Sequence, residues 1–405
     1  MGRVIDVKTL EGDQLRAAHT LFRAALHHPP ADDARWEQVR PSFRPGRTFG
    51  AYSGGTLVGT TMSFAFPMTV PGGAVLPSAA VTRVGVRADH TRRGALSALM
   101  REQLAAVAAA GEPLASLRAS EYPIYGRFGY GVATRGRDFT VDRRRAAFRP
   151  GAPTSGEVRL VDQTDLTTVL PRIYRRLAPG RPGFLQRDDA HWKIMLTMPG
   201  DGDSLLLAAV HTGPDGEDGF VTYRPQKNPT ADDPWGERLQ VEDLHAADVA
   251  ATADLWRFVL GVDLINQVRG WLRPLDEPLP LLLADPRMAR TSDLGDEAWL
   301  RLVDVPTALS ARSWAGADPV VLAVRDALLP ANTGNYLITP DGVSRVDQPA
   351  QLECDVAVLG MLYLGDVAPS TLAATGWLTV HDPAALPAAD ALFATGVTPW
   401  SGTFF

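Results

Sequence analysis

The chain has 405 residues, a formal net charge of −6 at neutral pH and a hydrophobic fraction of 45%. This length exceeds one ordinary core and predicts two or three domains, while the acidic balance argues against general nucleic-acid binding. No apolar run reaches the length of a membrane helix. One cysteine excludes an internal disulfide, and the N-terminus lacks an apolar signal core, which together favour a cytoplasmic protein. The eight histidines are scattered without ligand-like spacing, so no metal site is predicted.

The first segment, to about residue 147, alternates helix and strand and is expected to form one α/β domain. An amphipathic helix is predicted over 12–26. Strands are predicted over 48–52, 56–66, 79–86, 113–120 and 138–141. The Pro/Gly-rich stretch 148–154 then marks a domain boundary.

A short basic loop joins the strand at 79–86 to a helix whose apolar residues recur at helical spacing and which ends near Gly111. Free backbone N–H groups and the positive helix end should converge on one point there. Arg92 and Arg93 add fixed positive charge, and Gly94 lets a phosphate approach the backbone. A diphosphate is the natural occupant. Neither a P-loop nor a dinucleotide fingerprint is present.

A second pattern follows, Ala119-Ser120-Glu121 and then Ile124-Tyr125-Gly126-Arg127-Phe128-Gly129-Tyr130-Gly131. Together with the basic loop, it resembles the enhanced intracellular survival (Eis) branch of the GNAT acetyltransferases, and the resemblance extends over essentially the whole chain. The loop departs from the family pattern Arg/Gln-x-x-Gly-x-Gly/Ala, because Thr91 stands first and Leu96 last. The donors that bind phosphate come from the backbone, so the departure leaves them in place.

The resemblance implies two tandem GNAT-like domains followed by a sterol-carrier-like α+β domain. It also implies acetyl-CoA as co-substrate, Tyr125 as the general acid that protonates the coenzyme A thiolate, and the terminal carboxylate of Phe405 as the general base. A homohexamer is the expected assembly, with no nucleic-acid or membrane partner. The coenzyme is expected to contact Val84, Gly85, Val86, Arg92, Arg93, Gly94, Ala95, Leu96, Ser97, Ser120 and Glu121.

This set of residues suits acetyl transfer from a thioester to an amine. A carboxylate accepts the proton of the amine, a phenol returns one to sulfur, and the Val84 N–H is placed to stabilise the oxyanion. No nucleophile is needed, and Cys354 lies in an alternating, strand-like stretch typical of a core. The alternative roles are packing in a Gly-rich turn for Tyr125 and filling an apolar groove for Phe405.

The acceptor is less well defined by the sequence. Trp36 is expected to form a wall of its pocket, with Arg83 and Arg118 near its mouth. Nearby acids (Asp32, Asp33 and Glu37) could attract ammonium groups, as an aminoglycoside acetylated at several amines would require. The two arginines would repel such a polycation, so a less cationic amine, or one carrying an acid, stays an open alternative.

The second segment, 148–290, repeats the strand–loop–helix plan, but Asp248 replaces the glycine and arginine of the first loop and would repel a pyrophosphate. We therefore expect no coenzyme site in it. The third segment, 291–405, has strands over 300–305, 319–324, 335–339 and 351–356, with a hairpin turn at Pro340-Asp341-Gly342. A different class of function, a non-catalytic scaffold that binds coenzyme A or lipid, is the alternative to an enzyme.

Overall fold

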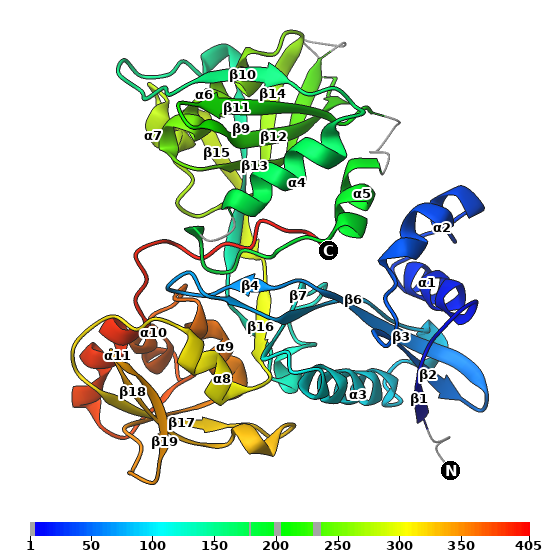
Figure 1. Ribbon diagram of the computed structural model, residues 1–405, viewed down its shortest axis with the longest axis vertical. Coiled ribbons are helices and arrows are strands. Elements are labelled where there is room, and N and C mark those ends of the chain that lie inside the picture. Colours follow the sequence, from blue (N-terminus) through cyan, green and yellow to red (C-terminus); the bar gives the residue numbers. More distant parts are fainter. Residues whose placement is uncertain (1–4, 178–179, 198–203, 230–235) are drawn as a thin grey trace. The chain divides into compact units, whose positions relative to one another are not determined.

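The computed structural model describes residues 5–177, 180–197, 204–229 and 236–405 (Figure 1). The chain divides into two compact units. The first unit comprises residues up to 134, 181–190 and 296–405, and the second comprises 135–180 and 191–295. None of the described helices is long and apolar enough to cross a membrane.

A seven-stranded sheet forms the centre of the first unit. Its strands, in spatial order, are β1 (Ile5–Thr9), β2 (Thr48–Ser53), β3 (Thr56–Ala65), β6 (Ser78–Val86), β7 (Leu114–Leu117), β16 (Trp299–Leu302) and β8 (Gly131–Val132). The short strands β4 (Met68–Thr69) and β5 (Val75–Leu76) form a separate hairpin. The strands expected at 48–52, 56–66 and 79–86 are therefore confirmed, whereas the one expected over 113–120 ends at Leu117.

Two helices, α1 (Gln14–Ala25) and α3 (Ala95–Ala109), cover opposite faces of this sheet (Figure 1). Thr60 is paired with Gly85, so these two residues share a face. A side chain at Gly85 would meet Phe22 of α1, whereas one at the adjacent Gly59 would meet Leu99 of α3. Because neighbouring residues of a strand point to opposite sides, the two helices must lie on different faces.

The two central parallel strands separate part-way along their length. Their backbone pairing ends at Val81 and Leu117, while β6 continues beside β3 as far as Val86. The register between β3 and β6 also shifts here, from Thr60 opposite Gly85 to Met62 opposite Thr82. This shift inserts one extra residue into β6, which is a β-bulge.

The third segment contributes one strand to the first sheet. Its strand β16, expected to begin the C-terminal domain, pairs antiparallel with β7 and also with β8. The remaining strands form a five-stranded sheet in the order β19 (Gly342–Val346), β18 (Gly334–Thr339), β17 (Val320–Arg325), β20 (Leu352–Asp355) and β21 (Thr379–Val380). The expected hairpin joins Thr339 to Gly342. Cys354 is buried on β20, and burial raises the pKa of its thiol, as suits a core residue.

The second unit has its own seven-stranded sheet. In spatial order it contains β10 (Glu157–Leu160), β11 (Leu207–Gly213), β12 (Gly216–Lys227), β13 (Glu237–Ala246), β14 (Ile265–Pro274), β9 (Arg135–Asp142) and β15 (Ala289–Asp296). The strand expected at 138–141 as part of the first segment is β9, which pairs instead with β14. The remaining α-helices of the chain are α2 (Asp33–Val39), α4 (Leu166–Leu177), α5 (Asp189–Thr197), α6 (Val249–Gly261), α7 (Leu279–Leu282), α8 (Val305–Ala311), α9 (Val356–Tyr363), α10 (Pro369–Ala374) and α11 (Leu386–Phe393).

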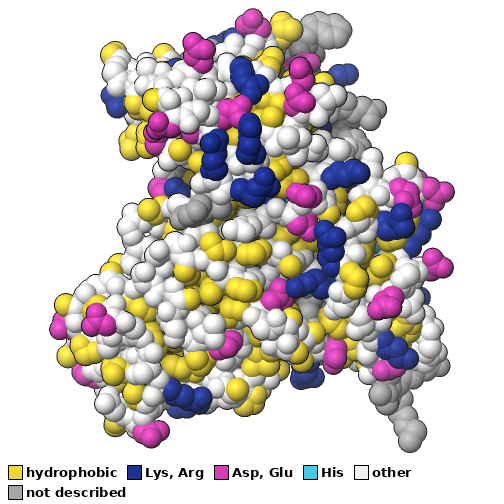
Figure 2. All heavy atoms as spheres, in the orientation of Figure 1, with side chains coloured by type: hydrophobic (Ala, Val, Ile, Leu, Met, Phe, Trp, Pro, Cys, Tyr) yellow, Lys and Arg dark blue, Asp and Glu magenta, His cyan; other side chains and the backbone are white. Residues whose placement is uncertain are grey.

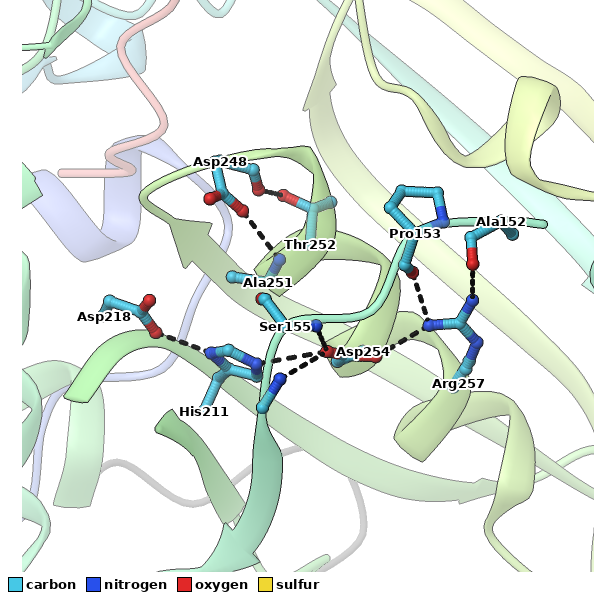
Figure 3. A network of polar contacts seen from close by, with 11 residues as sticks. Ala152, Pro153, Ser155, His211, Asp218, Asp248, Ala251, Thr252, Asp254 and Arg257 are labelled. Carbon is cyan, nitrogen blue, oxygen red and sulfur yellow. Dashed lines mark hydrogen bonds and ion pairs between the residues drawn. The ribbon is translucent and has the colours of Figure 1, made fainter. Parts of the chain in front are cut away.

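A polar network holds the segment before β10 in the second unit (Figure 3). His211 lies between two carboxylates, with Nδ1 2.6 Å from Asp218 and Nε2 3.2 Å from Asp254. Asp254 also accepts hydrogen bonds from the backbone N–H groups of Ser155 and Gly156. The network therefore ties residues 155–156 to α6 and β11, which is a structural role.

Asp248 lies at the N-terminus of a helix of the second unit, and arginines lie on the surface of the same unit. The Asp248 side chain accepts a hydrogen bond of 2.8 Å from the Ala251 N–H, so it occupies the N-terminus of α6 (Figure 3). Basic side chains gather over α4 in Figure 2. In this region Arg159 and Arg172 both form ion pairs with Glu217, which neutralises part of the positive charge.

Candidate active site

The expected diphosphate loop has the geometry of an anion site. Arg92 and Gly94 both adopt left-handed backbone conformations, with φ of +60° and +89°. Gly94 is the N-cap of α3 and provides no side-chain acceptor, and the first helical bond is from the Ala98 N–H to the Gly94 carbonyl, 3.0 Å. The N–H groups of residues 95–97 therefore point out of the helix end without helical partners. Such donors and the helix dipole are the features that stabilise a phosphate at a helix N-terminus.

The two arginines of the loop are free to take part. Arg92 and Arg93 are exposed, and neither side chain has a hydrogen-bond or ion-pair partner within the described residues. Leu96 packs against the apolar cluster that contains Val81, Leu117 and Tyr125, and Val84 packs against the same cluster. The loop, the bulged strand and the proposed acid are thus brought together around one core.

Tyr125 lies in the turn before a short 3-10 helix, Gly126–Phe128, and only 6% of its surface is exposed. Burial, followed by the negative charge of Glu121, raises the pKa of Tyr125 to about 12. The phenol therefore keeps its proton at neutral pH and is available as a donor. Its hydroxyl makes no hydrogen bond to any residue in the described ranges.

The glycine after this turn is dictated by its surroundings. Gly129 has a φ of +84°, and a side chain there would lie 2.6 Å from Nε of the fully buried Arg301. Only glycine fits both conditions. The glycine at position 129 is therefore required by backbone conformation and packing, independently of the expected role of Tyr125 as an acid. Ser120 and Glu121 follow the end of β7 and are exposed.

A buried carboxylate that the sequence did not reveal holds the C-terminal tail. Glu297 is 1% exposed and lies two residues before the start of β16. Its Oε2 accepts the Ser401 N–H at 3.0 Å, and its Oε1 accepts the Gly402 N–H at 2.8 Å. The Thr134 hydroxyl donates to Oε2 at 2.8 Å, and Nη1 of Arg118 lies 3.8 Å from Oε1. Burial raises the pKa of Glu297, whereas Arg118 and the three donors stabilise its carboxylate form.

An arginine holds the next part of the tail. Nη2 of Arg187 donates to the Gly402 carbonyl at 2.7 Å, and Nε donates to the Thr403 hydroxyl at 3.1 Å. Arg187 is 6% exposed, so these bonds are shielded from water. The tail is therefore fixed by polar contacts on both sides of its backbone. We call Glu297 and Arg187 the tail clamp.

The last two residues of the chain contact aromatic and basic side chains. The Arg118 guanidinium lies 5.1 Å from the centre of the Phe404 ring. Phe405 meets the edge of Phe66 at 6.2 Å between ring centres, and Phe66 stacks on Phe64 at 4.7 Å. Arg118, which was expected near the acceptor, therefore lies beside Phe404, the neighbour of the expected base Phe405.

The expected acceptor wall is a cluster of rings around α1 and α2. Trp36 is buried 5.5 Å from Phe43 and 5.8 Å from His19. The Arg83 guanidinium lies 4.4 Å from the centre of the Phe43 ring. Burial lowers the pKa of Arg83 to about 9, so it remains a cation at neutral pH.

The acids that were expected to attract ammonium groups are engaged elsewhere. Asp32 caps α2 by accepting the Arg35 N–H at 2.8 Å. Asp33 pairs with Arg16, and Glu37 pairs with Arg40, at 2.5 and 2.9 Å. Within the described residues, no group of three or more His, Cys, Asp or Glu side chains is arranged to hold a metal ion.

Comparison with known proteins agrees with this arrangement. Residues 6–133 and 183–302 each match an acetyltransferase (GNAT) domain, and residues 305–402 match a sterol carrier protein domain. The expected order of two GNAT-like domains and a sterol-carrier-like domain is thereby confirmed.

Relatives of full length carry related names. The N-acetyltransferase Eis of Mycobacterium tuberculosis is 38% identical over 362 residues, which cover 86% of each chain. An uncharacterised N-acetyltransferase of Streptomyces avermitilis is 35% identical over 423 residues, 99% of each chain. The crystal structure of Eis1 from Mycobacterium abscessus matches 99% of this chain and 100% of that chain, with a TM-score of 0.88 and 38% identity.

Proposed function

The chain belongs to the Eis family of GNAT N-acetyltransferases, and we propose that it transfers the acetyl group of acetyl-CoA directly to an amine of a small molecule while both substrates are bound. Direct transfer needs no covalent enzyme intermediate. It needs an anchored coenzyme, a base for the amine and an acid for the thiolate.

The residues of the first unit suit the coenzyme. Its pyrophosphate would accept hydrogen bonds from the N–H groups of Ala95, Leu96 and Ser97, with Arg92 and Arg93 supplying charge. Its pantetheine arm would enter where the pairing of β6 and β7 ends, along residues 84–86 and near residues 120–121. The uncapped end of α3 supports this assignment, because no side chain occupies the N–H groups that a phosphate would bind.

The transfer is balanced by two proton movements. The amine nitrogen attacks the thioester carbon, and its proton passes to the terminal carboxylate of Phe405. The Val84 N–H would stabilise the oxyanion that forms. The carbon–sulfur bond then breaks, and the Tyr125 hydroxyl donates its proton to the departing thiolate.

The polar anchoring of the tail is the observation that carries this assignment of the base. A tail that only filled an apolar groove would require no hydrogen bonds to a buried carboxylate and a buried arginine. Here two backbone N–H groups and one carbonyl of residues 401–402 are held by the tail clamp. Such contacts fix a main-chain position, as a terminal carboxylate acting as a base requires.

A one-residue extension tests the proposal. Adding one glycine after Phe405 moves the carboxylate by up to about 3.6 Å, beyond hydrogen-bond reach. We expect turnover, measured as free thiol released from acetyl-CoA with a panel of amines, to fall on the order of a hundredfold or more. Acetyl-CoA affinity and the unfolding temperature should stay unchanged, and an N-terminal glycine extension is the matched control. Full activity of the extended chain would refute the assignment, and no thiol release with any amine would favour the non-catalytic scaffold.

The family resemblance also leads us to propose a homohexamer. Light scattering of the full chain at assay concentration would test this assembly, and a monomer would contradict it.

A further inference from the structure

Arg83 occupies a strained position on the bulge of β6. Its φ is +50°, a left-handed conformation that is unfavourable for a residue other than glycine. It immediately precedes Val84, the proposed oxyanion donor. Backbone strain of this kind is retained where the surrounding structure enforces it, often at functional sites.

The Arg83 guanidinium has only neutral partners. Nη2 donates to the Ser42 hydroxyl at 2.9 Å, and Nη1 lies 3.0 Å from the Met62 sulfur. Phe43 and Phe64 present ring faces at 4.4 and 5.8 Å. No carboxylate pairs with it in the described part of the chain. A partly buried cation without an anion is costly, so this position favours an incoming negative group.

The neighbourhood adds positive charge to this position. His19 is 5% exposed, and neither of its ring nitrogens has a hydrogen-bond partner among the described residues. Burial, and then the charges of Arg83, Arg23 and Arg35, lower the pKa of His19 to about 3. Arg23 and Arg35 also lack acidic partners within the described ranges. Three arginines therefore surround a neutral histidine.

Two other arginines near the same sheet have acidic partners. Arg118 has Glu297 at 3.8 Å, and Arg47 pairs with Glu112 at 2.6 Å. The acids on α2 are used for helix capping or for exposed arginine pairs. The acids on α2 therefore do not neutralise the positive charge of the ring cluster at the acceptor wall.

We infer that Arg83 binds a carboxylate of the acetyl acceptor, so that the acceptor is an amino-carboxylate with an apolar or aromatic body and not a polycation. The guanidinium fork matches a carboxylate, and the rings of Phe43 and Phe64 suit an apolar body. The inference rests on the proposed function.

The geometry gives the acceptor an orientation. Arg83 lies against Phe64, Phe64 stacks on Phe66, and Phe66 contacts Phe405. This row of rings connects the arginine to the chain end. An acceptor with its carboxylate at Arg83 would therefore extend its amine along the rings toward the terminal carboxylate.

Two isosteric acceptors test the inference. The probes are 4-(aminomethyl)benzoate and 4-(aminomethyl)benzamide, with an aminoglycoside as the polycation, and the readout is thiol release. For the wild type we expect kcat/KM on the benzoate to exceed that on the benzamide at least about tenfold, the effect of 1.4 kcal/mol. In Arg83→Met this preference should disappear, mainly through a higher KM for the benzoate, with the benzamide little affected. Arg40→Met, which removes an exposed arginine paired with Glu37, should keep the preference.

The outcomes separate this inference from the proposed function. Equal rates on benzoate and benzamide in the wild type, or an aminoglycoside rate at or above the benzoate rate, would overturn the inference while leaving an N-acetyltransferase. Equal loss on both probes in Arg83→Met would give Arg83 a structural role only. The wild-type comparison requires no variant to fold. Failure of every amine to release thiol would contradict the proposed function itself.

Discussion

Replacing Glu297 with glutamine should separate the position of the tail from the rest of the fold. Glutamine keeps the shape of the side chain but has one acceptor oxygen where the carboxylate has two. In the wild type, one oxygen binds the Gly402 N–H and the other binds the Ser401 N–H and the Thr134 hydroxyl. In Glu297→Gln, the NH₂ group must face at least one of these donors.

The cost follows from the bonds that are lost. A hydrogen bond to a charged group contributes about 1.5–3 kcal/mol. Loss of one such bond from a buried site would shift the docking equilibrium of the tail roughly 10- to 150-fold. We therefore expect kcat to fall on the order of tenfold to a hundredfold. KM for acetyl-CoA should stay unchanged, because the hydrogen bonds of Glu297 join it to Thr134, Ser401 and Gly402 and not to the residues expected to bind the coenzyme.

The assay needs a control for the loss of a buried glutamate. Glu277 in the second unit is 3% exposed and accepts hydrogen bonds from Trp256 and Arg273 at 3.0 and 2.8 Å. Glu277→Gln should lower the unfolding temperature with kcat preserved. A double-mutant cycle distinguishes an effect on the position of the tail from a general loss of stability. In the glycine-extended chain, whose carboxylate is already displaced, Glu297→Gln should cost almost nothing more in kcat.

Two results would refute this reasoning. The first is a folded Glu297→Gln protein with wild-type kcat. The second is an equal fractional loss of kcat in the normal and the extended chain, because independent effects multiply. Either result would leave Glu297 as a structural residue and remove the tail clamp from the mechanism.

Two further predictions concern the acid and the coenzyme. Tyr125→Phe deletes the proton donor but keeps the buried ring, so thiol release should fall on the order of a hundredfold with little change in acetyl-CoA affinity; wild-type turnover would mean that Tyr125 only packs. Gly94→Asp places negative charge beside the phosphates and a side chain at a φ of +89°, so acetyl-CoA binding measured by calorimetry should be lost; unchanged affinity in the folded variant would exclude the loop as the diphosphate site.

Local patterns predicted many of the strands that build the first unit, but they could not assign every strand to its sheet. The strand near residue 138 was recognisable from its composition, yet its partner β14 lies about 130 residues away in the chain. The same holds for β16, which reads as the start of the third segment but pairs with β7. Alternation shows that a segment is a strand and which face is apolar, and it does not name the neighbour.

In the candidate site, too, contiguous motifs could be predicted from the sequence, whereas contacts between distant residues could not. The loop around Gly94 and the turn around Tyr125 are contiguous, so their spacing alone indicated them. The acids on α2 were expected to face an acceptor, but local partners had already taken them, an outcome that depends on side-chain rotamers. Glu297 and Arg187 gave no sequence signal, because each acts on residues 401–403, more than a hundred positions later.

The tail clamp also suggests a role for the sterol-carrier-like domain, for which we expect no catalytic side chains. Near its start the third segment contains Glu297 and then β16, which pairs with β7 in the first sheet, and near its end the N–H groups of Ser401 and Gly402 bond to Glu297. The residues just before the sterol-carrier-like domain and those at its end are thus joined through the Glu297 carboxylate. These contacts hold residues 401–403, and the Phe405 ring lies beside Phe66. If Phe405 supplies the base as we propose, the domain serves the reaction by fixing the position of Phe405. Any change that separates residues 401–403 from Glu297 should then lower kcat before it lowers the affinity for acetyl-CoA.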